Sequence, residues 1–213
     1  MFPALYAILD VSHAAGAGAS LAQTLSGAGV ELIQIRDKKA PTRKVYDASK
    51  SLVETLAAGG VRIIVNDRPD IAAMIGAGGV HVGQEDLPVE VARKICGSAR
   101  WVGVSTHNLE QLREADGTSA DYIAVGPIFP TATKENPDPV VGLDFLRAAR
   151  QITKKPLVAI GGITIESAEA VYRAGADSVA VVQDLISAGD PAQRVREYLA
   201  IAVQVFSHRA GAA

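Results

Sequence analysis

Hydrophobic and polar positions follow a regular order along the chain, in which short apolar runs alternate with longer amphipathic segments. The apolar runs have the length of buried β-strands. They lie at Leu5–Leu9, Glu31–Arg36, Arg62–Asn66, Gly79–Val82, Trp101–Ser105, Asp121–Val125, Leu157–Ile160 and Ser178–Val182. Segments of helical character separate and follow them, at Ala19–Ser26, Thr42–Ala57, Pro69–Ile75, Pro88–Ile95, Leu109–Ala115, Leu143–Gln151, Ile165–Arg173 and Ala192–Val205. The pattern predicts eight successive strand–helix units.

The strands lack polar alternation, which is typical of a parallel sheet that is covered on both faces. Eight units of this kind predict an α/β fold, a closed (β/α)8 TIM barrel. We expect a single domain over residues 1–213, with 206–213 as a frayed tail. A doubly wound open sheet is the alternative, because alternation of strands and helices does not by itself show closure.

Composition narrows the class of protein. The chain of 213 residues is 48% hydrophobic and 21% charged, as in ordinary globular domains. A formal net charge of −2 disfavours a nucleic-acid partner, so that any anion site must be local. The single cysteine, Cys96, indicates a reducing compartment. We see neither a signal-peptide pattern nor an apolar run of membrane-spanning length, and expect a cytoplasmic protein with no membrane partner.

In a TIM barrel the chemistry lies at the carboxyl ends of the strands. The second strand ends in polar residues, of which Gln34, Arg36 and Lys38 share one side by the period-2 alternation of a strand. Two cations and an amide at a barrel mouth form a clamp for an anion. The alternative is an ion-paired strand end without a ligand.

Two carboxylates follow neighbouring strands. Asp67 comes directly after the third strand, and Asp86 lies in the loop after the fourth. We expect them to share one Mg²⁺, which typically takes one or two carboxylates and is completed by water and substrate phosphates. The alternative is that each caps a helix, Asp67 ahead of Pro69 and Asp86 ahead of Pro88.

Two further segments carry candidate phosphate-binding residues. The long loop after Gly126-Pro127 contains Thr131, Thr133 and Lys134, which suit phosphate oxygens, although a solvated loop is the alternative. Gly162 follows the seventh strand, where backbone N–H groups can approach an anion.

The fifth strand ends at Ser105, which can reach a substrate but lacks the glycine-framed elbow of an activated nucleophile. His81 lies within the fourth strand, and we interpret it as a hydrogen-bonded residue of the core or mouth and not as a metal ligand.

At these residues the sequence resembles the thiamine-phosphate synthase family, over about Leu5 to Leu199. The matching motifs stand in the family's order: Gln34-Ile35-Arg36-Asp37-Lys38, Asn66-Asp67-Arg68, His81-Val82-Gly83-Gln84-Glu85-Asp86, Gly103-Val104-Ser105-Thr106-His107, Gly126 to Lys134 and Ile160-Gly161-Gly162-Ile163. The resemblance implies a Mg²⁺-dependent transferase that joins hydroxymethylpyrimidine diphosphate to thiazole phosphate and releases pyrophosphate.

Residue roles follow from the same resemblance. It implies that Asp67 and Asp86 hold Mg²⁺. It implies that the pyrimidine diphosphate is bound by Gln34, Ile35, Arg36, Asp37, Lys38, Asn66, Ser105 and Lys134, of which Arg36, Lys38, Ser105 and Lys134 are catalytic. It implies that the thiazole phosphate is bound by Thr131, Ala132, Thr133, Gly162, Val182 and Gln183. Many relatives carry a serine where this chain has Gln183, so the side-chain contact there departs from the pattern.

Other functions remain open from the sequence. A thiazole tautomerase-like isomerase of the same fold would not need the carboxylate pair together with Arg36 and Lys38. An aldolase or an isomerase of amino-acid biosynthesis would need a Schiff-base lysine or an acid–base pair of carboxylates. A non-catalytic sensor of thiazole phosphate would share the binding residues. The oligomeric state is not predicted.

Overall fold

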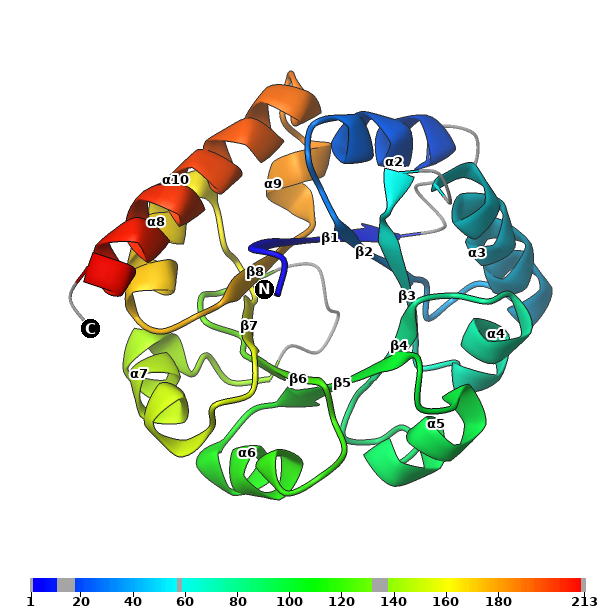
Figure 1. Cartoon of the computed structure of the whole chain (residues 1–213), viewed down its shortest axis with the longest axis horizontal. Coiled ribbons are helices and arrows are strands. Elements are labelled where there is room, and N and C mark those ends of the chain that lie inside the picture. Colours follow the sequence, from blue (N-terminus) through cyan, green and yellow to red (C-terminus); the bar gives the residue numbers. More distant parts are fainter. Residues whose placement is uncertain (1, 11–17, 57–58, 132–137, 212–213) are drawn as a thin grey trace.

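The structure, a computed structural model, describes residues 2–10, 18–56, 59–131 and 138–211. Its strands pair in parallel and in sequence order, and β1 pairs with both β2 and β8, which closes the sheet. Figure 1 shows the strands as a central ring surrounded by helices. The predicted TIM barrel is therefore confirmed, and the open doubly wound sheet is excluded.

The strands are β1 (Leu5–Asp10), β2 (Leu32–Arg36), β3 (Arg62–Asn66), β4 (Gly79–Val82), β5 (Trp101–Thr106), β6 (Tyr122–Val125), β7 (Leu157–Ile160) and β8 (Ser178–Val181). The helices are α2 (Gly18–Gly27), α3 (Thr42–Leu56), α4 (Pro69–Met74), α5 (Val89–Cys96), α6 (Leu109–Asp116), α7 (Gly142–Ile152), α8 (Ile165–Arg173), α9 (Gln183–Ile186) and α10 (Pro191–Gly211). None of these described helices is both long and apolar enough to cross a bilayer.

The predicted segments agree with these bounds to within one residue, except at the last helix. The short helix α9 was not predicted. Residues 206–211, which were expected to belong to a frayed tail over 206–213, lie within α10, which continues through Gly211. Phe206 packs edge-on against Tyr172 with ring centroids 5.4 Å apart, and Arg209 donates to the carbonyl of Tyr172. These contacts with α8 stabilise the last turns.

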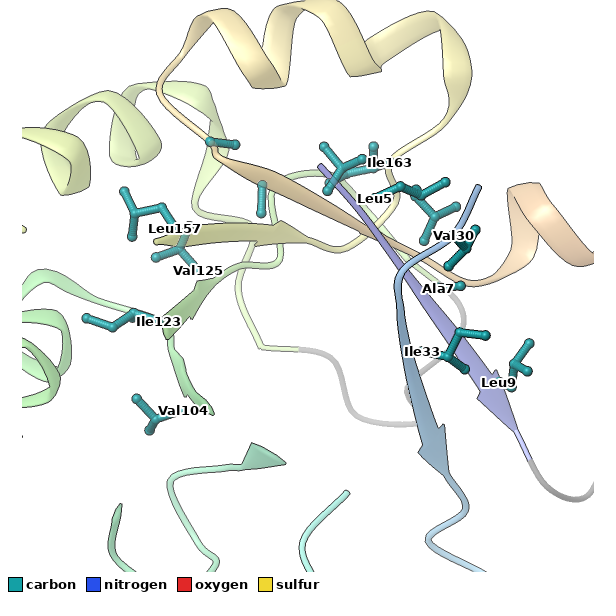
Figure 2. Close-up of a cluster of buried hydrophobic side chains, with 14 of the residues drawn as sticks. Leu5, Ala7, Leu9, Val30, Ile33, Val104, Ile123, Val125, Leu157 and Ile163 are labelled. Atoms are coloured by element: carbon teal, nitrogen blue, oxygen red, sulfur yellow. The ribbon is translucent and has the colours of Figure 1, made fainter. Parts of the chain in front are cut away.

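The larger hydrophobic core lies between the barrel and its helices. It takes alternate residues of each strand, such as Leu5, Ala7 and Leu9 of β1 and Ile123 and Val125 of β6, shown in Figure 2. Because successive side chains of a strand point to opposite faces, the residues between them face the barrel interior. The strands are apolar on both faces for this reason, and they carry no simple alternation in sequence.

A second, smaller core fills the barrel interior, and it includes Tyr6, Leu32 and Tyr122. At the amino-terminal end of the strands, Phe2 stacks on Trp101 with ring centroids 5.1 Å apart, and the Arg62 guanidinium lies 4.0 Å from the Trp101 ring. The barrel is thus filled with side chains on this side, and the polar strand ends gather at the opposite mouth.

Candidate active site

Neighbouring side chains at the end of β2 point to opposite faces of the strand. Gln34 is 3% exposed and lies on the interior face, where its Nε2 donates to the Tyr6 hydroxyl at 2.8 Å. Ile35 packs into the outer core, so that its side chain lies on the opposite face of β2. The prediction from period-2 alternation, that the Gln34 side chain points away from the Ile35 side chain, is therefore confirmed.

The chain turns immediately after β2. The Asp37 carboxylate accepts hydrogen bonds from the backbone N–H groups of Lys39 and Ala40, each at 2.9 Å, which closes a local turn. Lys38 extends from this turn to Asp67, with 3.2 Å between Nζ and Oδ2. The Lys38 side chain keeps 52% of its surface exposed, so the ion pair leaves it accessible to a ligand. Arg36, at the end of β2, is partly exposed.

Asp67 and Asp86 come together as the sequence predicted. Asp67 follows Asn66, the last residue of β3, and has a left-handed φ of 60°, which Asp tolerates better than most residues. Its backbone N–H donates to the carbonyl of His81 on β4 at 2.8 Å. Burial, together with a hydrogen bond to the Asp86 carboxyl and the charge of that group, raises the pKa of Asp67 to about 6, and Lys38 partly opposes the shift.

Asp67 and Asp86 do not cap the helices that follow them, so the capping alternative is excluded. The N-cap residues of α4 and α5 are Arg68 and Pro88, and neither helix has a side-chain capping bond. Asp86 instead accepts from the backbone N–H of Gly83 at 2.8 Å through Oδ2. Both carboxylates are therefore held by the loops after β3 and β4 and remain directed to one another.

Ser105 lies on β5 at the same mouth and is partly exposed. Its hydroxyl is 2.8 Å from Nε2 of His81, and the Gln84 side chain donates to its backbone carbonyl at 2.6 Å. His81 is 7% exposed, and burial lowers its pKa to about 4, so the imidazole is neutral at pH 7. The interpretation of His81 as a hydrogen-bonded core residue is confirmed.

The loop after β6 begins as an extension of the barrel. The backbone N–H groups of Ile128 and Phe129 donate to the carbonyls of Ile160 and Gly161, at 2.8 and 3.0 Å. Further along, the backbone N–H of Val141 donates to the carbonyl of Pro127 at 2.8 Å, so that the two ends of the loop meet. Thr131 lies on this loop and is partly exposed. The predicted residues Ala132, Thr133 and Lys134 lie outside the described residues.

Gly162 lies against this loop. It has a φ of 62°, and a Cβ built on it would approach the carbonyl oxygen of Pro130 to 2.3 Å. Only glycine therefore allows the β7 loop and the β6 loop to approach so closely.

Helix α9 follows β8 directly. Val182 is its N-cap, and Gln183 is its first residue and is exposed. Asp184 anchors the helix to α10, since its carboxylate accepts from Arg194 at 2.8 Å and from the buried Tyr198 hydroxyl at 2.8 Å. The first backbone N–H groups of α9 thus have a defined position at the mouth, beside the glycine-rich end of β7.

The comparison with protein families decides what kind of barrel this is. A family model described as thiamine monophosphate synthase matches residues 5–185, which covers all eight strands. The chain belongs to the thiamine monophosphate synthase family. The family expected from the sequence motifs is therefore confirmed.

Individual members of the thiamine monophosphate synthase family support this result. The chain is 50% identical over 205 residues to a thiamine-phosphate synthase of Koribacter versatilis, covering 93% of this chain and 95% of the relative. It is 44% identical over 173 residues to one of Chloroflexus aurantiacus, covering 81% and 80%. A solved thiamine phosphate pyrophosphorylase of Pyrococcus furiosus superposes with a TM-score of 0.85 at 34% identity, covering 95% of this chain and 96% of that one.

Two parts of the site were not predicted before the fold was known. Helix α9 has four residues, which is too few for a periodic pattern to show. Tyr6 and Tyr122, which lie next to Gln34 and His81 inside the barrel, read in sequence as apolar strand residues. A signal for them was present, because buried tyrosines usually need a hydrogen-bond partner for the hydroxyl group.

Proposed function

We propose that this member of the thiamine monophosphate synthase family joins hydroxymethylpyrimidine diphosphate to thiazole phosphate, giving thiamine phosphate and pyrophosphate. The observation that carries the proposal is the cluster of Asp67, Asp86 and Lys38 at one mouth. An enzyme that expels pyrophosphate has to neutralise charge developing on the departing oxygens, and this cluster offers the groups for it. A tautomerase or a simple sensor of thiazole phosphate has no such need.

The two carboxylates suit Mg²⁺. Burial and the neighbouring Asp86 carboxyl both raise the pKa of Asp67, and a divalent cation held by the two carboxylates would replace their mutual repulsion with attraction. Both supply oxygen ligands, and Mg²⁺ in phosphate sites commonly uses one or two carboxylates with water and substrate oxygens completing its shell. When bound, the ion would offset the charge of the pyrophosphate oxygens. We therefore propose Asp67 and Asp86 as its ligands.

The chain's own residues would bind and orient the pyrimidine substrate. Arg36 and Lys38 would donate to the diphosphate, and Asn66, at the end of the neighbouring strand, would add a neutral donor. Gln34 and Ser105 would hold the aminopyrimidine ring across the mouth. Lys134 is proposed from the sequence resemblance alone as a further cation on the leaving group.

The thiazole phosphate would lie between the β6 loop, the β7 loop and α9. Thr131, the backbone of Gly162 and the first N–H groups of α9, after Val182, would bind its phosphate. The carbon–oxygen bond of the pyrimidine substrate breaks and its electron pair leaves with pyrophosphate. The lone pair of the thiazole nitrogen then forms the new carbon–nitrogen bond. No enzyme nucleophile would be required, because the thiazole nitrogen would attack the pyrimidine carbon directly once the site had brought both rings into line.

A direct assay tests the proposal. Purified protein with both substrates and Mg²⁺ should form thiamine phosphate and pyrophosphate in equal amounts, and omission of either substrate should abolish both products. EDTA should stop the reaction, and added Mg²⁺ should restore it. Interconversion of thiazole phosphate isomers without pyrophosphate release would instead identify an isomerase. Binding of thiazole phosphate without any turnover would identify a sensor.

We also propose a cytoplasmic location. It rests on the single cysteine, Cys96, which is buried and reduced in the structure.

A further inference from the structure

Five polar side chains form one continuous hydrogen-bonded chain across the barrel interior. Its members come from five strands, and we call it the interior relay: Gln34, Tyr6, Tyr122, His81 and Ser105. Gln34 Nε2 is 2.8 Å from the Tyr6 hydroxyl, which is 2.9 Å from the Tyr122 hydroxyl. The Tyr122 hydroxyl is 3.1 Å from His81 Nδ1, and His81 Nε2 is 2.8 Å from the Ser105 hydroxyl.

The middle of the interior relay is shut off from water. Tyr6 and Tyr122 are 1% and 0% exposed, and His81 is 7% exposed. Within the described part of the chain, their polar side-chain atoms form hydrogen bonds only to other members of the relay. A Cβ at Gly103 would lie 2.0 Å from Cζ of Tyr122, so the glycine makes the room for this ring.

The number of protons available fixes the direction in which hydrogen bonds are donated along the interior relay. Gln34 donates to the Tyr6 oxygen, so the single hydroxyl proton of Tyr6 goes to its remaining neighbour, Tyr122. Tyr122 then donates to Nδ1 of His81. A neutral imidazole carries one N–H, which is then on Nε2 and donates to Ser105. The proton of Ser105 remains available to a ligand.

The opposite direction requires every bond to reverse together. If the Gln34 amide presented its oxygen to Tyr6, then Tyr6 would accept from Tyr122 and Tyr122 would accept from Nδ1–H of His81. Nε2 would then accept the proton of Ser105. The mouth would meet an amide NH₂ at Gln34 and a lone pair at Ser105, in place of an amide oxygen and a hydroxyl proton. The two ends of the relay therefore cannot vary independently.

We propose that the interior relay fixes the donor and acceptor pattern that Gln34 and Ser105 present to the pyrimidine ring, with Tyr6, Tyr122 and His81 as positioning residues. The identity of this ligand rests on the proposed function. In the direction that the structure has, the Gln34 oxygen accepts from the exocyclic amino group of an aminopyrimidine. An oxopyrimidine, with a carbonyl in place of that amino group, would need the whole relay to reverse. The relay thus selects the amino form.

The first test reads the direction in the ligand-free wild-type chain. Nitrogen NMR on ¹⁵N-histidine-labelled protein distinguishes the two neutral tautomers and the imidazolium, and His81→Gln assigns the His81 signals. We expect the N–H on Nε2 at pH 7. An N–H on Nδ1, or an imidazolium, would overturn the proposal. This measurement does not depend on catalysis, so it stands even if the chain does not make thiamine phosphate.

The second test reverses the interior relay from its far end. An ionised carboxylate can only accept hydrogen bonds. Gln34→Glu should therefore move the N–H of His81 from Nε2 to Nδ1 at the pH where the introduced carboxyl group ionises. Residue 34 does not contact His81, so the change would have to pass through Tyr6 and Tyr122. The double variant Gln34→Glu with Tyr6→Phe should not show this pH-dependent switch. Ionisation without a switch, or a switch that survives the loss of the Tyr6 hydroxyl, would overturn the coupling.

The third test measures specificity. Tyr122→Phe and Tyr6→Phe should each lower the preference in kcat/KM for the amino over the oxo substrate about tenfold or more, with KM for thiazole phosphate unchanged. The control is Tyr172→Phe, which removes another tyrosine hydroxyl, one bonded to the carbonyl of Ala4 outside the relay. An unchanged preference in both relay variants would overturn the proposal. If one variant fails to fold, the other decides.

Discussion

The carboxylates of Asp67 and Asp86 lie within hydrogen-bonding reach of each other, although their positions follow different strands of the barrel. Burial and this neighbour raise the pKa of Asp67 to about 6, while Lys38 acts against both. Two like charges are held together at a cost in free energy, so the arrangement is informative about function. Binding of a divalent cation and substrate phosphates at this site would explain why the unfavourable pair of carboxylates is maintained.

We expect Asp67→Asn and Asp86→Asn each to raise the Mg²⁺ concentration needed for half-maximal rate, and to lower kcat on the order of 10²-fold, the scale of losing one aimed electrostatic contact. Steady-state kinetics over a Mg²⁺ titration measure both effects. The control is Asp70→Asn, which removes the same charge from an exposed residue that pairs with Arg68. Near-normal kinetics of both site variants at limiting Mg²⁺ would contradict the two-carboxylate site.

The glycine at position 162 should be irreplaceable for a steric reason. Gly162→Ala adds a Cβ that would lie 2.3 Å from the Pro130 carbonyl oxygen, whereas Gly76 has nearly the same φ, 69° against 62°, with open space around it. We expect Gly76→Ala to cost on the order of 1 kcal/mol through backbone strain alone. Gly162→Ala should cost roughly 1–3 kcal/mol more and raise KM for thiazole phosphate.

Denaturant unfolding and steady-state kinetics of the two glycine variants measure these effects. Equal stability and equal KM in the Gly162 and Gly76 variants would show that the β6 and β7 loops tolerate separation.

Gln183 is exposed at the first position of α9, so substitutions can separate the contributions of its backbone and its side chain to phosphate binding. If the backbone N–H groups do most of the binding, Gln183→Ser should change thiazole phosphate affinity by less than about 1 kcal/mol. Gln183→Glu should weaken binding clearly, because a carboxylate would face the phosphate. Calorimetric titration measures both, with Gln151→Glu, an exposed position at the end of α7, as the control for added charge. Wild-type affinity in Gln183→Glu would move the phosphate site elsewhere.

Buried His81 should make the fold sensitive to acid. Burial lowers its pKa from 6.5 to about 4, so between these values the unfolded chain binds a proton that the folded chain does not. Stability is therefore fully present above pH 6.5 and is lost as the pH falls toward 4. From pH 7 to pH 5 the loss from this one group is about 2 kcal/mol.

Urea unfolding of wild type and His81→Gln at the two pH values isolates this contribution, because Asp67 titrates in both proteins. The variant should lose less stability than wild type on acidification. The control is His208→Gln, an exposed histidine of α10, which should behave as wild type. Equal acid losses in wild type and His81→Gln would mean that His81 is charged in the fold.

The order of elements was determined by the sequence. Apolar runs of strand length, separated by amphipathic segments, are local features, and they predicted the strands and all but the shortest helix. The apolar runs also located the polar residues at the strand ends, because the carboxyl end of a strand lies where its apolar run stops. In a barrel all such ends meet at one mouth, so Gln34, Asp67, Asp86 and Ser105 could be grouped before any coordinates were known.

Tertiary structure alone decided what these residues contact. A strand that is buried on both faces reads as apolar throughout, so the sequence does not tell the barrel interior from the outer core. Tyr6 and Tyr122 are 116 positions apart, and their hydroxyl groups meet only because the sheet closes. Likewise, the sequence left open whether Asp67 and Asp86 cap helices or face each other, and the paths of the loops after β3 and β4 bring the two carboxylates together. Which polar groups share a proton is a property of the closed barrel.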